Sequence, residues 1–73
     1  MERKYDYIAW EEEGLWTAHS PSIPGVYGIG ATRSKATQSL FDGVDDLLDY
    51  LTEIGETLPP ARRFVQGTLT VDV

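Results

Sequence analysis

Few side chains in this sequence are of the types that carry out catalysis. The chain has one histidine, His19, and no cysteine. No recognisable motif places a serine nucleophile beside His19, and a lone histidine in a strand-like segment is usually a half-exposed packing residue. Gly25, Gly28 and Gly30 follow prolines but lack the lysine and the spacing of a phosphate-binding loop. We therefore expect no enzymatic activity and no cofactor.

Paired carboxylates are the next chemistry to consider. A two-metal nuclease site needs several acids around one pair of ions, and Asp6 and Asp72 are the candidates on the first and last predicted strands. If these strands run parallel and begin level, the two carboxylates lie about 20 Å apart at about 3.3 Å per residue. An antiparallel pairing would instead bring them together. The parallel arrangement, which we favour, predicts no metal site.

A long amphipathic helix is predicted from about residue 33 to residue 54. Its apolar residues recur at steps of three and four, which is the helical period: Ala36, Leu40, Val44, Leu47, Leu51 and Ile54. The opposite face carries the acidic residues Asp42, Asp45, Asp46, Asp49, Glu53 and Glu56. Like charges at these spacings repel one another, and the later ones oppose the negative end of the helix dipole.

Two interpretations of this acidic face remain open, a solvated surface and a docking surface for a basic protein. We favour docking, because the charges gain nothing for the helix itself, and we assign the contact to Asp42, Asp45, Asp46, Asp49 and Glu53. The whole chain has 12 acidic and 6 basic residues and a formal charge of -6, the wrong sign for binding phosphate backbones. We expect no direct nucleic-acid binding.

The N-terminal part of the chain predicts a β-hairpin from two alternating segments, residues 4–10 and 15–19. A three-residue loop ending at Gly14 would place Trp10 opposite Trp16 and Ile8 opposite Ala18. Tyr5 and Tyr7 would then lie on the sheet face away from the helix. A four-residue loop would shift every pairing by one.

The remaining elements complete an α+β fold. Prolines exclude a helix over residues 21–25, residues 26–30 predict a short third strand, and Thr32 is suited to cap the helix. Gly55 can end the helix, and residues 64–73 alternate as a long fourth strand. The sequence thus predicts one domain, residues 1–73, with β-β-β-α-β order. Its four-stranded mixed sheet and single long helix form a two-layer sandwich, with the last strand parallel to the first.

The connector between hairpin and helix resembles the signature of HicB-like antitoxins. The matching residues are Pro21, Ile23, Pro24, Gly25, Gly30 and Thr32, with Tyr5 before them and Leu58-Pro59-Pro60 after the helix. Ser22 and Lys35 depart from the pattern, where the family usually has Asp and Glu. The resemblance implies a partial ribonuclease-H-like fold and a protein that neutralises a small basic HicA-like ribonuclease toxin. The DNA-binding domain usual in that family is not expected here.

Small size predicts self-association. A domain of this length buries only about 60% of its unfolded surface, and no disulfide can staple it. We therefore expect a homo-oligomer, a dimer or a tetramer. Its candidate oligomer or partner interface consists of Tyr5, Tyr7, Phe41, Leu48 and Phe64.

No apolar run approaches the roughly 20 residues that span a bilayer, and the N-terminus has no apolar signal region, so a cytoplasmic location without membrane contact is expected. The alternative function is a small oligomeric ligand-binding or scaffolding protein without catalysis.

Overall fold

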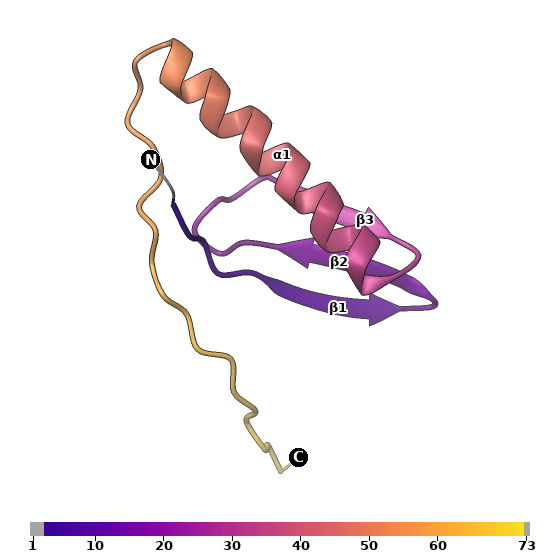
Figure 1. The fold of residues 1–73 in the computed structure, drawn as a ribbon. Helices are drawn as coiled ribbons and strands as arrows, with labels where there is room; N and C mark the ends of the chain where they lie inside the picture. The colour runs from indigo at the N-terminus through magenta and orange to yellow at the C-terminus, as the bar shows by residue number, and fades with distance from the viewer. Residues whose placement is uncertain (1–2, 73) are drawn as a thin grey trace.

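The computed structural model describes residues 3–72 and contains three strands and one helix. The strands are β1 (Ile8–Glu12), β2 (Leu15–His19) and β3 (Tyr27–Gly30), and the helix is α1 (Arg33–Glu53). The strands form an antiparallel sheet in the order β1-β2-β3, and α1 lies across one face of it (Figure 1). The predicted four-stranded mixed sheet is therefore wrong, although the first three strands and the helix follow in the predicted order.

The β1–β2 hairpin closes through a two-residue turn, Glu13-Gly14. Both residues have positive φ, 52° and 81°, as a type I′ turn requires. Trp10 consequently pairs with Thr17 and Ala9 with Ala18. The predicted pairing of Trp10 with Trp16 is wrong by one residue, because the tighter turn suits the twist of the two strands better than a three-residue loop.

The core is small and lies between β2, β3 and α1. Ala18, Ala36 and Leu40 are buried in contact with one another, and Trp16 and Val44 pack partly buried against them. Gly28 brings the helix onto the sheet, because a Cβ there would collide with the backbone of Ala36 and Leu40.

Local signals set both ends of α1. The side chain of Thr32 accepts a hydrogen bond from the amide of Lys35 at 3.1 Å, which confirms the predicted cap. At the other end Gly55 has φ 74°, its amide donates to the carbonyl of Thr52, and the amide of Glu56 donates to that of Leu51. This pair of bonds is a Schellman motif.

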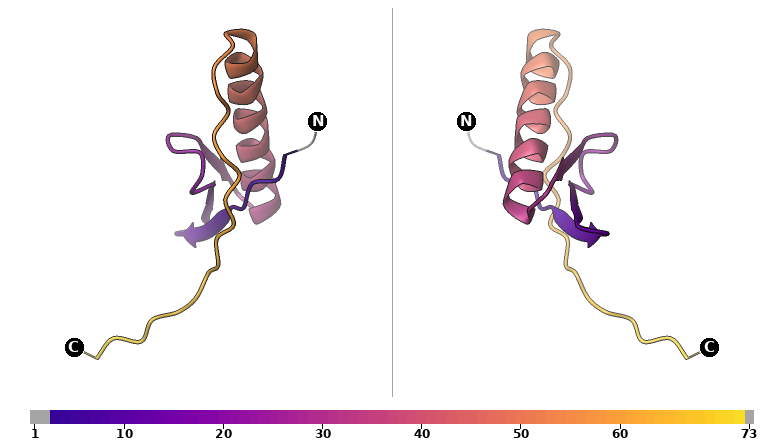
Figure 2. Two further views of the ribbon diagram at one scale, coloured as in Figure 1. Left: turned by 90° about the vertical axis from the view of Figure 1, so that its left-hand side faces the viewer. Right: turned by 90° about the vertical axis from the view of Figure 1, so that its right-hand side faces the viewer.

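The C-terminal tail, residues 56–72, forms neither strand nor helix, so the predicted fourth strand at residues 64–73 is wrong. Val73 itself lies outside the described residues. The tail returns from the end of α1, passes the N-terminal segment and then leaves the body of the protein (Figures 1 and 2). Val65 and Leu69 are each 90% exposed. The alternating pattern is present, but within residues 3–72 no strand pairs with it.

Candidate protein-binding site

His19 lies on the sheet face away from α1, where its ring stacks on Tyr27. The ring centroids are 5.0 Å apart and the planes differ by 16°. The imidazole is half-buried. This arrangement is the packing role that the sequence predicts for a lone strand histidine.

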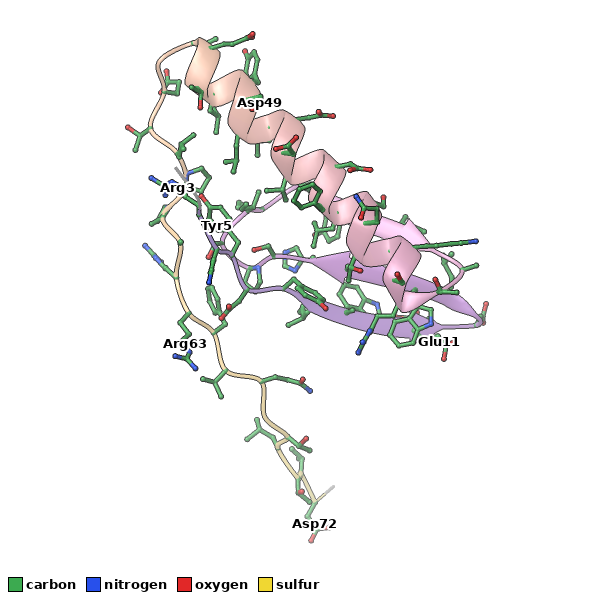
Figure 3. The ribbon with its side chains drawn as sticks, in the orientation of Figure 1. Arg3, Tyr5, Glu11, Asp49, Arg63 and Asp72 are labelled. Carbon is green, nitrogen blue, oxygen red and sulfur yellow. The ribbon has the colours of Figure 1, made fainter. Side chains whose placement is uncertain are left out.

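The predicted carboxylate candidates lie in unrelated places. Over residues 3–72 there is no cluster of three or more His, Cys, Asp or Glu that could hold a metal ion. Asp6 accepts a hydrogen bond from the amide of Phe64, while Asp72 stands at the far end of the tail (Figure 3). The level, parallel strands assumed for this pair do not form, since Asp72 belongs to no strand.

The acidic face of α1 is exposed along the second half of the helix. The five predicted contact residues are all exposed, as is Glu56 beyond them: Asp42, Asp45, Asp46, Asp49 and Glu53. Asp42 accepts a hydrogen bond from the side-chain amide of Gln38 at 3.0 Å. The first turn of the helix has no acid and the last turn has no base, so its ends gain no stabilisation from complementary charges.

A groove runs along α1, between the helix and residues 3–7. It has a volume of about 870 Å³, and it is lined by four of the predicted interface residues, Tyr5, Tyr7, Phe41 and Leu48. The prediction that Tyr5 and Tyr7 lie on the outer sheet face is wrong, because both line this groove on the helix side of the sheet. We call this groove between α1 and residues 3–7 the aromatic groove.

Hydrogen bonds hold the N-terminal wall of the aromatic groove in place. The hydroxyl of Tyr5 donates a hydrogen bond to the carbonyl of Pro59 at 2.7 Å, so the C-terminal tail holds Tyr5 in position. The buried Ser20 hydroxyl donates to the carbonyl of Asp6, also at 2.7 Å. Residues outside any strand are thereby fixed beside the helix.

The acidic face and the aromatic groove meet. Asp45 and Asp49, one helical turn apart, are exposed and line the groove together with Phe41 and Leu48. Figure 3 shows Asp49 on the helix and Tyr5 beside the tail. A ligand seated in the groove would therefore contact aromatic rings and carboxylates at the same time. On the helix wall this combination suits a cationic group carried on an apolar stem, while Arg3 and Lys4 line the wall formed by residues 3–7.

Phe64, the fifth predicted interface residue, does not line the aromatic groove. It borders a second hollow, whose wall includes Asp6, Ile8 and the following tail residues. Tyr5 and Tyr7 border this second hollow as well, so they lie between the aromatic groove and Phe64, whereas Phe41 and Leu48 belong to the aromatic groove alone.

A second apolar surface, which was not predicted from the sequence, lies on the open face of the sheet. Ile8, Trp10, Leu15, Tyr27 and Ile29 are all partly exposed there. A two-residue turn in the hairpin would have predicted this surface. The shorter loop shifts the pairing by one residue and so places Ile8 and Trp10 on the face of the sheet opposite to Ala18.

Comparison with known proteins does not extend these observations. No family model matches the chain, and no curated protein or solved structure matches it. No helix in the described part of the chain is both long and apolar enough to cross a membrane.

Proposed function

We propose that this protein is a non-catalytic protein-binding module, which captures a small basic protein of the HicA-like ribonuclease type and so neutralises it. The observation that carries the proposal is the junction of two surfaces on α1. A row of exposed carboxylates runs along the helix, and two of them, Asp45 and Asp49, also line the aromatic groove.

Charge favours a basic partner. The chain carries a formal charge of -6, and the acids of α1 repel one another at helical spacing. Complementary surfaces of this kind steer a cationic protein into contact and raise its association rate. The aromatic groove would then retain the partner, because a buried aromatic or arginine side chain contributes most of the affinity at typical interfaces.

The nature of the partner rests on the HicB-like signature in the connector. Three residues of that signature have structural roles in this protein. Ile23 is fully buried, Gly25 has φ 88° and Thr32 caps the helix. The connector therefore positions α1 on the sheet. The acidic face that α1 presents has the sign required for a basic toxin.

Association kinetics with a purified HicA-like toxin test the proposal. The triple variant Asp45→Asn, Asp46→Asn, Asp49→Asn should associate more slowly than the wild type and with a weaker dependence on salt. The matched control removes three exposed carboxylates from the hairpin instead: Glu11→Gln, Glu12→Gln and Glu13→Gln. If both triple variants bind with the same rate, net charge alone acts and the acidic face is merely solvated.

A second candidate function is the binding of a small apolar ligand in the aromatic groove. Its volume of about 870 Å³ falls within the range of about 300–1,000 Å³ typical of ligand sites. Native mass spectrometry of protein purified from cells would detect such a ligand. The Phe41→Lys variant should then lose it, whereas a mass equal to that of the bare chain would contradict this function.

A further inference from the structure

The sheet face away from α1 forms a regular grid of side chains across three strands. Ile8 pairs with His19, which pairs with Tyr27, and Trp10 pairs with Thr17, which pairs with Ile29. Residues directly opposite one another in antiparallel strands point to the same face. Glu12 and Leu15 form the last pair. These eight residues make up what we call the outer sheet face.

The residues that face α1 determine which residues belong to the outer sheet face. Ala9 pairs with Ala18 and Ala18 with Gly28, and Ala18 is buried against α1. Neighbours of these residues along each strand must point the other way, because successive side chains alternate between the two faces of a strand. The stacking of His19 on Tyr27 agrees with that placement.

The outer sheet face is apolar and largely uncovered. Five of its eight residues are large hydrophobic side chains, each between 37% and 56% exposed: Ile8, Trp10, Leu15, Tyr27 and Ile29. Glu12 is its one charged residue, at a corner of the grid. Monomeric proteins seldom expose apolar patches beyond a few hundred Å², and larger ones mark interaction sites.

We propose that the outer sheet face is the interface of a homodimer, in which two copies pack sheet against sheet with their helices outward. Sheets that pack face to face do so with their strands within about 30° of one another, and a two-fold axis lets each residue of the patch meet the same patch on the other copy. The dimer would be a four-layer assembly, helix, sheet, sheet, helix.

Charge argues for a second copy as the occupant. The helix α1, which carries the acids, covers the opposite face of the sheet (Figure 1), so two copies can approach through their outer sheet faces without bringing the acidic helices together. A highly charged partner would find almost no complementary charge on this face. An identical apolar face matches it without leaving buried charges unpaired.

The size of the core argues for a permanent occupant. Among residues 3–72 only four apolar side chains are buried, Ala18, Ile23, Ala36 and Leu40, which is little for an independent domain. A second copy is always available to cover the apolar face, because it is made together with the first, whereas a transient partner is not. A biological interface needs about 1,000 Å² in total, or about 500 Å² from each copy. Complete burial of one aromatic side chain removes about 150–250 Å² from solvent, and these five side chains still expose between 37% and 56% of their area, so together they are of that order.

This dimer is independent of the proposed toxin capture, because the acidic face and the aromatic groove lie on the helix side and stay free. Light scattering coupled to size exclusion measures it without any partner. The test variant is Ile29→Lys on the outer sheet face, and its matched control is Phe41→Lys in the aromatic groove. The two positions are 56% and 63% exposed, so neither change buries a charge within one copy.

We expect the wild type and Phe41→Lys to have the mass of a dimer at micromolar concentration, and Ile29→Lys to have that of a monomer with the same far-ultraviolet circular dichroism. If Ile29→Lys fails to fold, Tyr27→Glu in the other row of the grid provides the same readout. In the wild type, dilution should shift tryptophan emission to the red, and Trp10→Phe should abolish this shift.

Two results would overturn the proposal. One is a wild type that is monomeric across the micromolar range. The other is a dimer that survives both Ile29→Lys and Tyr27→Glu, and its loss when the chain is cut after Arg63 would then assign the contact to the tail. A dimer that persists after this truncation but is lost in Ile29→Lys supports the outer sheet face.

Discussion

The backbone amide of Phe64 donates a hydrogen bond to the carboxylate of Asp6, with 2.7 Å between the nitrogen and Oδ2. The bond joins residues 58 positions apart and fixes where the tail passes the N-terminal segment. At this point the amide of Phe64 is bonded to a side chain and not to the carbonyl of a neighbouring strand.

Asp6→Ala should release the tail at this point. We expect a loss of about 1 kcal/mol in the free energy of unfolding, a typical value for one hydrogen bond. Trypsin should also cut faster after Arg62 and Arg63. Urea denaturation and limited proteolysis measure the two effects. Asp72→Ala, at the free end of the tail, is the control and should change neither.

Gly28→Ala should be the most damaging small substitution in the sheet. The added Cβ would collide with the backbone of Ala36 and Leu40, which cannot rotate away as a side chain can. Overpacking of this kind costs about 1–3 kcal/mol. Gly67→Ala is the control, since its Cβ would meet no atom within 4 Å. Equal midpoints of thermal unfolding for the two variants would show that the helix can shift to make room.

Glu13→Asn should stabilise the hairpin. Glu13 has φ 52°, a conformation that asparagine adopts more readily than glutamate, and Asn-Gly is the preferred sequence of a type I′ turn. The left-handed conformation costs an ordinary residue about 1–2 kcal/mol, and we expect asparagine to recover part of this cost as a gain in the free energy of unfolding. The same substitution at Glu12, which lies in β1, should bring no gain, because asparagine is disfavoured in strands. A gain at both positions would point to charge rather than backbone conformation.

Removing acids from α1 should raise the melting temperature slightly. Each like-charge pair at helical spacing costs about 0.2–0.5 kcal/mol, so Asp45→Asn, Asp46→Asn and Asp49→Asn together should add a small gain that fades in high salt. Differential scanning calorimetry at two salt concentrations measures it. An unchanged melting temperature at low salt would mean that the carboxylates do not repel one another measurably, and repulsion within α1 would then no longer favour a docking role for its acidic face.

Single- and double-stranded RNA should remain intact when incubated with the protein and magnesium or manganese. The expectation follows from the separation of Asp6 from the acids of α1 and of the tail. Gel electrophoresis of labelled RNA is the measurement, with a known ribonuclease as the positive control. Cleavage that disappears in Asp6→Asn would contradict the assignment of a non-catalytic protein.

The features that could be predicted from sequence are those with local causes. An α-helix makes its hydrogen bonds within its own segment, so the spacing of Ala36 and Leu40 predicted α1, and Thr32 and Gly55 predicted its ends. The acidic face followed from the same period. All of its predicted residues are exposed in the structure.

Strands depend on partners elsewhere in the chain, and their arrangement was decided only in three dimensions. The alternation from Phe64 onward describes a strand, but no neighbouring strand completes it among residues 3–72. The pairing of Trp10 depended on one residue of loop length, which sequence alone left open. That single step moved Tyr7 into the aromatic groove and Ile8 and Trp10 to the outer sheet face, because side chains alternate along a strand and a shift of one residue reverses every face.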